Sequence, residues 1–457
     1  MCHNNYMSFI EKFREALKIP TYWLPATQDQ PLQDGGMAVK NALAILQRFQ
    51  EFLVEHFPAF HRAAERWVLN PFSVVYRWPG TFNSNTGAVL FLAHYDVVPA
   101  EKEKWSFDPF GAEMKDGYIY GRGSLDMKSI LISLMEAAED FCARGWQPKR
   151  DIWFAFGGDE ERTGIQGAME TARWFEERGQ RFDWVLDEGT PVGEGQIKDI
   201  DSPLALISIE EKGYLSLDLT VTQEPGHASR PPRVQAAAVL GRALRRIAKR
   251  PFPSRLSPTV EMFFARIAPL LPGIQGFVMR HARALGPLFF RIAAANPTTV
   301  SMLQTTVAMT QLEGSAADNV LPSEVRAVIN LRLLWPWTVE TATAFIKKAI
   351  NDKRVRVSTH GLGTNPVAAR REYNNEGWMK IQAAMEEAWP GVPLLPFIMV
   401  ASTDSRHYQR LSDGIFRFNP HKLDPIELSG IHGHDERISE ENLRKGLVFY
   451  SELMRSL

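Results

Sequence analysis

Cysteine is scarce in this sequence. Only Cys2 and Cys142 occur among 457 residues, which is too few for a disulfide framework or a cysteine-based zinc site. A reducing compartment is therefore the default expectation. The first 20 residues also lack a basic segment followed by an apolar core, so they do not read as a secretory signal. We predict a cytoplasmic protein.

Neither an excess of one charge nor a long apolar run is present. The chain has 52 Lys and Arg against 53 Asp and Glu, which gives no electrostatic case for a nucleic-acid partner. No stretch reaches the roughly 18 uninterrupted apolar residues of a membrane span, so we expect no transmembrane segment. The length exceeds one ordinary hydrophobic core and predicts two domains.

Strands and helices alternate through the first part of the chain. We predict strands at 72–78, 87–93, 151–157 and 182–186, with helices at 40–57, from Asp126 to about 143, and at 168–178. Acidic residues follow several of these strands. This pattern predicts an α/β catalytic domain with a mostly parallel central sheet flanked by helices, and a site at the carboxyl edge of that sheet.

The pattern changes after Pro203, where strands at 204–210 and 214–222 have no helix between them. Later helices and strands that need not be parallel predict a smaller inserted α+β domain, serving as a lid or dimerisation domain. Helical periodicity returns at 374–388 and 440–456. We therefore predict three segments: catalytic domain 1–210, inserted domain 211–362, and catalytic domain 363–457.

Residues 251–300 form an unusual segment inside the predicted insert. Phenylalanines stand among leucines, prolines and arginines at positions Phe263, Phe264, Phe277, Phe289 and Phe290. We interpret this segment as a helical insertion. Core and dimer packing is the favoured role for these aromatic side chains, ahead of a membrane contact.

A histidine and an aspartate leave the strand at 87–93 together. Residues two apart on a strand point to the same side, so His94 and Asp96 share a direction. Asp96 suits a carboxylate that orients a metal-bound imidazole, although it could equally be a surface turn residue.

Six histidines and carboxylates lie at predicted strand ends, at the start of a predicted helix, or in a loop near the end of the sequence. They are His94, Asp126, Glu160, Glu161, Asp187 and His432. Histidine with carboxylates and no cysteine suits two divalent ions, such as zinc, with cobalt or manganese also fitting. A carboxylate that bridges both ions would give the two-metal arrangement that activates water. Because Glu160 and Glu161 are adjacent and point differently, one can bind metal while the other transfers a proton.

Seven motifs together resemble one known family. They are FLAHYDVVP (91–99), YGRGSLDMK (120–128), FGGDEERTG (156–164), LDEG (186–189), PGHASRPP (225–232), DNVLPSEVRAVINLR (318–332) and IHGHDERIS (431–439). The chain resembles the two-zinc metallopeptidase and amidohydrolase family of carboxypeptidase S, aminoacylase, glutamate carboxypeptidase and succinyl-diaminopimelate desuccinylase. Within it, the resemblance is to the branch of carboxypeptidase S and the N-fatty-acyl-amino-acid synthase/hydrolase.

The resemblance implies a role for each matching residue. His94 and Asp187 would bind one zinc, Glu161 and His432 the other, with Asp126 bridging the two. By the same resemblance, Asp96 would orient His94, and Glu160 would be the general base. His227 of the insert would polarise the scissile carbonyl. Asn319 and Arg332 would bind substrate, and Thr403 and Asp404 would belong to a substrate loop. His434 is expected to be a loop neighbour, and His421 a surface or loop histidine.

The expected activity is hydrolysis of an amide bond next to a free carboxylate, by metal-activated water. The substrate would be a peptide C-terminus or an N-acyl amino acid, and the protein a possible homodimer through the insert. An aminopeptidase or dipeptidase of the same clan is the alternative enzyme. A catalytically silent binding protein with this fold is the alternative of another class, but every proposed ligand and the base are present.

Overall fold

The computed structural model describes residues 3–22, 37–81, 87–195, 197, 199–293, 297–361 and 373–457. The predicted domain boundary at 362/363 and Cys2 lie outside these residues. No helix within the described part of the chain is both long and apolar enough to cross a membrane.

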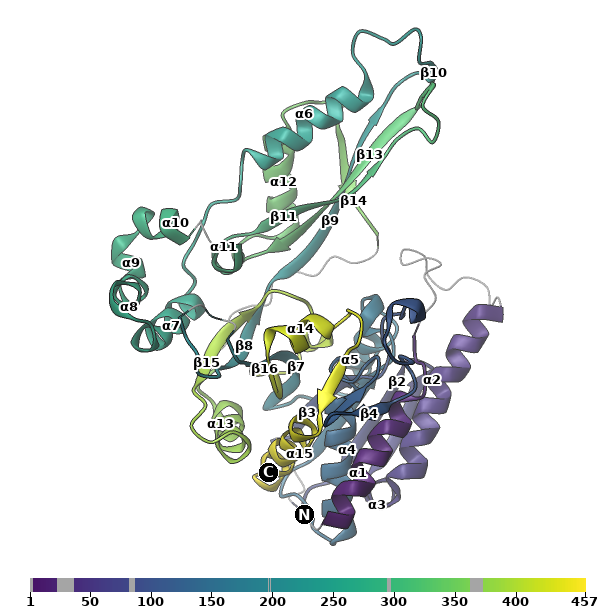
Figure 1. The fold of residues 1–457 in the computed structure, drawn as a ribbon, viewed down its shortest axis with the longest axis vertical. Helices are drawn as coiled ribbons and strands as arrows, with labels where there is room; N and C mark the ends of the chain where they lie inside the picture. Colours follow the sequence, from purple (N-terminus) through teal and green to yellow (C-terminus); the bar gives the residue numbers. More distant parts are fainter. Residues whose placement is uncertain are drawn as a thin grey trace.

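An eight-stranded sheet forms the centre of the larger part of the molecule (Figure 1). Its spatial order is β1 (Glu65–Asn70), β2 (Ser73–Trp78), β6 (Ile152–Gly157), β3 (Val89–His94), β7 (Trp184–Gly193), β16 (Ile415–Leu423), β8 (Ala205–Glu211) and β15 (Leu394–Met399). The run from β6 to β16 is parallel, as is β8 with β15, whereas β1 and β2 are antiparallel at one edge. The predicted mostly parallel sheet is confirmed.

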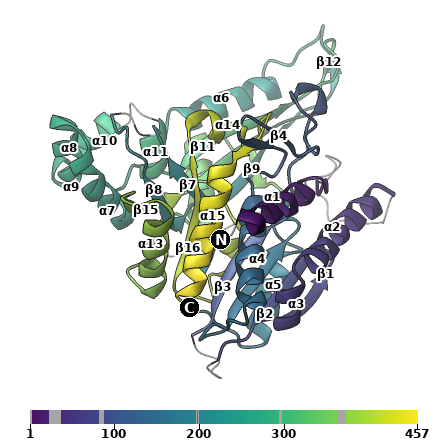
Figure 2. The same cartoon turned by 60° about the horizontal axis from the view of Figure 1, so that its bottom comes forward.

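Helices cover both faces of this sheet. One face carries α1 (His3–Leu17), α2 (Met37–His56), α3 (Pro58–Ala63), α4 (Lys128–Ala143), α13 (Glu376–Ala388) and α15 (Glu440–Arg455), and the other carries α5 (Ala168–Glu177). Along β6, Phe154 and Phe156 face the larger helix group, while Trp153 and Ala155 face α5, as strand alternation requires. Helix α15 lies between α4 and α13 (Figure 2).

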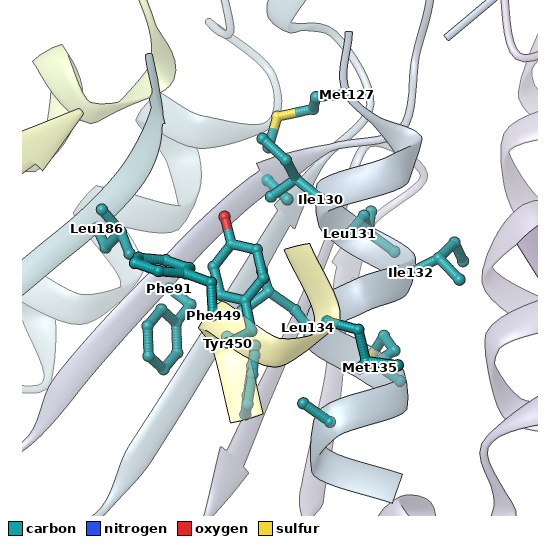
Figure 3. Close-up of a cluster of buried hydrophobic side chains, with 14 of the residues drawn as sticks. Phe91, Met127, Ile130, Leu131, Ile132, Leu134, Met135, Leu186, Phe449 and Tyr450 are labelled. Carbon is teal, nitrogen blue, oxygen red and sulfur yellow. The ribbon is translucent and has the colours of Figure 1, made fainter. Parts of the chain in front are cut away.

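The packing of α4 and α15 against the sheet is shown in Figure 3. Phe91 and Leu186 of the sheet, Ile130 and Leu134 of α4, and Tyr450 of α15 are each at most 2% exposed. Burial of one such large side chain contributes about 1.5–3 kcal/mol relative to leaving it in water. This core holds α4, which begins at Lys128 two residues after Asp126, against the sheet.

A second, smaller sheet is antiparallel throughout. Its order is β11 (Thr306–Glu313), β13 (Glu324–Leu333), β9 (Gly213–Thr222) and β14 (Arg356–Thr359). Helices α6 (Ala236–Ala248) and α12 (Val339–Ile350) pack on it around their own core. At its far end, β10 (Gly226–His227) pairs with β12 (Val320–Leu321) (Figure 1). This is the predicted α+β insert; its exact boundaries stay a prediction.

A single buried lysine separates the two sheets along the chain. Strand β8 ends at Glu211 and β9 begins at Gly213. Between them, Nζ of Lys212 donates hydrogen bonds of 2.8 and 2.9 Å to the carbonyl oxygens of Ser301 and Gln304. Lys212 thus ties the junction between the sheets to the end of the helical insertion.

The helical insertion packs on the larger sheet. It comprises α7 (Pro258–Ile267), η3 (Ala268–Leu270), α8 (Gly273–Arg280), α9 (Ala282–Leu285), α10 (Pro287–Ala293) and α11 (Pro297–Leu303). Its buried side chains join Leu206 of β8 and Leu395 of β15 in one cluster. Phe263 and Phe289 lie in this core as expected, but Phe277 is 56% exposed, so the predicted core packing holds for only part of the aromatic set.

Candidate metal centre

Loops at the carboxyl edge of the larger sheet bring the predicted polar side chains together. These are His94 at the end of β3, Asp126 before α4, Glu160 and Glu161 in the 3-10 helix η2 (Glu160–Arg162) after β6, and His432 after α14 (Pro425–Gly430). In the register, His94 pairs with Gly157, so the ends of β3 and β6 are level. The edge therefore gathers residues that lie far apart in the sequence.

Asp126 lies between the two histidines. Its Oδ1 is 3.0 Å from Nε2 of His94, and its Oδ2 is 3.0 Å from Nε2 of His432. Oε1 of Glu161 lies 3.1 Å from the same His432 nitrogen. Burial opposes ionisation of Asp126, but hydrogen bonds from His432 and His94 outweigh it and lower the pKa of this carboxyl.

Buried Glu436 holds the two loops that carry Asp126 and His432. Its Oε1 accepts hydrogen bonds from the backbone N–H groups of Leu125 at 2.7 Å and Asp126 at 3.2 Å. Its Oε2 accepts one of 2.6 Å from Arg122. Because Glu436 follows His432 by four residues, these contacts set Asp126 opposite His432.

Glu188, which the sequence analysis did not select, reaches this cluster. Its Oε1 lies 3.4 Å from Nε2 of His94, and the ligand atoms of His94, Glu160 and Glu188 lie within 4.8 Å of one another. The cause is a bulge in β7, because β16 pairs Arg417 with Asp187 but Phe418 with Thr190. A bulge redirects a side chain, and the Gly189 that follows Glu188 is the sequence signal that could have indicated it.

Asp187 points elsewhere, although the sequence analysis expected it to bind metal. Its Oδ2 accepts a hydrogen bond of 2.8 Å from the backbone N–H of Ser405, and its Oδ1 accepts one of 2.9 Å from that of Glu188. The side chain thus anchors the 402–406 loop behind the cluster. In this structure Glu188, and not Asp187, lies beside His94; the metal role of Asp187 stays a prediction.

Asp96 lies directly behind His94 and is completely buried. Its Oδ1 lies 3.4 Å from Nδ1 of His94, and its two oxygens accept hydrogen bonds from the backbone N–H groups of Glu160 and Glu161 at 3.2 and 3.1 Å. The reading of Asp96 as a surface turn residue is therefore wrong. One carboxylate therefore contacts the imidazole of His94 and the backbone of both glutamates.

The side chains of Glu160 and Glu161 point in different directions, as expected for adjacent residues. Its Oε1 lies 3.6 Å from a guanidinium nitrogen of Arg406, which itself donates hydrogen bonds of 2.9 and 2.6 Å to the carbonyl oxygens of Thr403 and Thr163. Burial raises the pKa of Glu160 well above its ordinary value. The cause is desolvation, which favours the protonated form of a carboxyl.

Several carboxyl groups are crowded together in this buried region, and their pKa values are raised. Burial raises the pKa of Glu188 to about 8, with the charge of Asp126 adding to the effect, and burial likewise raises the pKa values of Glu161 and Asp187. Buried carboxylates need counter-charge. Imidazole nitrogens together with carboxylate oxygens are the ligands that zinc, cobalt and manganese accept.

Thr403 and Asp404 lie behind the site, where the sequence analysis expected substrate contact. They are 1% and 5% exposed. A Cβ on Gly157 would lie 2.8 Å from Oδ2 of Asp404, so glycine is needed at the end of β6. Burial, opposed by Arg406, raises the pKa of Asp404 well above normal. Thr403 and Asp404 are thus buried in this chain, while Arg406 of the same loop reaches Glu160; a substrate role for Thr403 and Asp404 stays a prediction.

His227 and Asn319 sit together at the tip of the smaller sheet. The N–H of Ala228 donates a hydrogen bond of 2.9 Å to the carbonyl oxygen of Asn319, and the exposed His227 contacts Ser229 at 2.8 Å. Strand β10, which carries His227, is at the end of the insert away from the larger sheet (Figure 1). Within one chain these two residues do not approach the metal-ligand cluster.

Arg332 occupies the opposite end of β13 from Asn319. The strand has 10 residues, and such a length spans roughly 30 Å. The guanidinium of Arg332 lies 4.9 Å from the ring centre of Tyr214 and 3.4 Å from the hydroxyl of Ser402. Arg332 is therefore near the metal side of the insert, and the structure separates it from the residue with which it was expected to pair.

The sequence profile of peptidase family M20/M25/M40 matches residues 90–456. The chain is 31% identical over 450 residues to the N-fatty-acyl-amino acid synthase/hydrolase of Xenopus tropicalis, covering 98% of this chain and 85% of the relative. It is 32% identical over 416 residues to the probable carboxypeptidase S-like 2 of Dictyostelium discoideum, covering 90% and 79% of the two chains.

Solved structures of low identity share the fold. The M20 family metallo-carboxypeptidase from Sulfolobus solfataricus superposes with a TM-score of 0.70 at 14% identity, covering 100% of this chain and 99% of the other. Human carnosine dipeptidase 1 gives 0.65 at 16% identity, covering 99% and 97%. The family profile covers most of the chain, and the named relatives match the predicted branch. This chain belongs to peptidase family M20/M25/M40 and is a metallo-hydrolase of that family.

Proposed function

We propose that this protein hydrolyses an amide bond adjacent to a free carboxylate, with two divalent cations, zinc being the best fit. The observation that carries the proposal is the position of Asp126, which directs one oxygen toward each of two histidines. Histidine and carboxylate ligands around a shared carboxylate are the donor set of two-metal hydrolases.

The ligand assignment follows the geometry. His94 and Glu188 would hold one cation, Glu161 and His432 the other, and Asp126 both. When bound, such ions polarise a carbonyl oxygen and lower the pKa of a coordinated water. Asp96 keeps His94 in place through its Nδ1 side, which leaves Nε2 free to face the cation.

Glu160 would handle the proton. Its carboxyl is buried beside the ligands. Arg406 lies next to this carboxyl, and the carboxylate of Asp96 accepts a hydrogen bond from the backbone N–H of Glu160. It takes a proton from the attacking water and delivers it to the nitrogen of the leaving amine, which completes cleavage of the C–N bond.

Arg332 is the group suited to the substrate carboxylate. Its pKa is lowered by burial, yet arginine remains charged in proteins, and its planar guanidinium matches a carboxylate in a two-pronged hydrogen bond. Stacking on Tyr214 limits the orientations of the guanidinium. A carboxylate held here distinguishes a carboxypeptidase or acyl-amino-acid hydrolase from an aminopeptidase.

His227 would donate a hydrogen bond to the carbonyl oxygen as negative charge develops on it. Since His227 lies at the tip of the insert, this role requires closure of the insert or contribution from a second copy of the chain. Mixing inactive His227→Ala protein with inactive Glu160→Gln protein separates these cases. Recovery of activity in the mixture supports a shared site and a homodimer; no recovery supports closure within one chain.

The substrate is either an N-acyl amino acid or a peptide C-terminus. The relatives named as N-fatty-acyl-amino acid synthase/hydrolase and carboxypeptidase S-like protein support these two classes. Human carnosine dipeptidase 1 shares the fold, so a dipeptidase or aminopeptidase is the alternative. Comparing a free peptide with its C-terminally amidated form tests the proposal: cleavage of the free form alone supports it, and equal cleavage of both contradicts it.

A further inference from the structure

Large apolar side chains are exposed on the helical insertion. On α8, Ile274 is 77% and Phe277 56% exposed; on α10, Leu288 is 56% and Ile292 52% exposed. Each pair is spaced three or four residues apart, so its two members project from the same side of their helix. The four side chains, with Arg280 and Arg291, are called here the α8–α10 face.

The helical insertion has a packed core, although these apolar side chains of α8 and α10 are exposed. On the inner side of the same helices, Gly276, Phe289 and Ala293 are buried, and the ring of Phe263 in α7 packs 5.3 Å from that of Phe397 in β15. The insertion is therefore seated on the larger sheet, and the α8–α10 face is directed away from it. Figures 1 and 2 show α8, α9 and α10 as a lobe at one side of the molecule.

All charged side chains in residues 262–312 of the helical insertion and the strand after it are positive. Residues 262–312 contain no aspartate or glutamate, although the whole chain has a net charge of −1. The cations of that segment are arginines at 266, 280, 283 and 291. Two acidic side chains from outside this segment contact it at the surface: Glu261 lies 3.2 Å from Arg283, and Asp199 accepts a hydrogen bond of 3.0 Å from Gln275.

The charge argues against a second copy of the chain as the occupant. A two-fold contact places the same surface on both partners, which would bring two copies of Arg280 and Arg291 into one interface with no acidic side chain from this face to pair with them. An anionic partner removes that repulsion. Bulky apolar side chains on one face of a helix, with cationic side chains next to that face, are found in helices that lie in a lipid interface, and arginine matches phosphate oxygens well.

We propose that the α8–α10 face docks the protein onto an anionic lipid surface, with its four apolar side chains entering the interface and its arginines contacting lipid phosphates. The proposal does not depend on the substrate of the metal centre.

The test is co-sedimentation of the full chain with vesicles of phosphatidylcholine alone or with added phosphatidylglycerol. Wild-type protein should bind the anionic vesicles, bind the neutral ones far less, and be released by salt. Both Phe277→Ser/Ile292→Ser and Arg280→Gln/Arg291→Gln should weaken binding by roughly tenfold or more.

Matched controls lie on the smaller sheet and its helix α6. Leu312, which is 69% exposed, is replaced by serine, and the exposed Arg242 and Arg245 of α6 by glutamine. These variants should bind as wild type does, and all variants should keep the wild-type unfolding temperature. Equal vesicle binding by wild type and face variants would overturn the proposal, as would absence of binding. So would a wild-type dimer that dissociates in Phe277→Ser/Ile292→Ser, because that result makes the face a contact between copies.

Discussion

Asp126 directs one carboxylate oxygen to each of two histidines: Oδ1 lies 3.0 Å from His94 Nε2, and Oδ2 lies 3.0 Å from His432 Nε2. The two histidines come from loops separated by more than three hundred residues of sequence, and Glu436 holds these loops together. Removal of Asp126 therefore affects both halves of the cluster.

Replacement of Asp126 by alanine should abolish binding of both cations, because each loses a shared ligand. The measurement is metal content per chain after dialysis against a low-metal buffer. Asp413, which is 82% exposed at its side chain, supplies the control: Asp413→Ala should keep the wild-type content. An Asp126→Ala protein that still holds two metals would rule out the bridging role.

Asp187 and Glu188 should differ in their effect on metal binding. Glu188→Gln removes a charged ligand beside His94 and should lower the affinity for one of the two cations. Asp187→Asn retains an acceptor for the Ser405 N–H and should keep both cations. Metal titrations of the two variants decide the assignment; the reverse order of effects would restore Asp187 as the ligand.

Replacement of Glu160 by glutamine should reduce kcat by at least about a hundredfold, the usual scale for loss of a general acid–base group. Metal content should be unchanged, since the substitution keeps the size of the side chain and leaves the ligands intact. Turnover and metal content are measured on the same sample. Turnover close to that of wild type would show that another group carries the proton.

His421 should make stability sensitive to acid. It is fully buried in β16, and neither ring nitrogen has a hydrogen-bond partner among the described residues, whereas a surface or loop histidine was expected. Burial lowers the pKa of His421 from 6.5 to about 3. Between these values the unfolded chain binds a proton that the native one does not, so the free energy of unfolding falls as pH drops through this window.

The substitution His421→Leu should remove this contribution of His421 to the pH dependence of the free energy of unfolding. Between pH 7 and pH 5, metal-free wild type should lose about 2 kcal/mol more unfolding free energy than the variant. Denaturant titrations at both pH values measure the difference. Replacement of the exposed His434 by glutamine is the control and should leave the wild-type dependence. If His421→Leu shows the same pH dependence as wild type, the imidazole is protonated or solvated in the native state.

Much of the site could be predicted because strand ends meet at one edge of a parallel sheet. That rule brings His94 and Glu161 together without knowledge of the detailed packing. The bulge that turns Glu188 toward His94 could not be foreseen, because it depends on the register of β7 with β16, a strand more than two hundred residues later.

Long-range packing also explains the other differences. Strand β16 (IFRFNPHKL) contains proline and charged residues, so no apolar run marked it as central, and His421 was not expected to be buried. The helical insertion is recognisable as helical, but its docking on β8 and β15 depends on strands from two distant parts of the chain. The side chains left exposed on α8 and α10 follow from that docking.

The most direct test of the account is hydrolysis of a mixed panel by metal-reconstituted protein, with a chelator control. The panel holds N-acetyl, N-long-chain-acyl and dipeptide forms of several amino acids, each with a free and an amidated carboxyl group. We predict release of the amino acid from at least one free-carboxylate class, lost with the chelator and regained on return of zinc. Cleavage that persists in the chelator, or no cleavage of any compound by protein carrying two metals, would contradict the account.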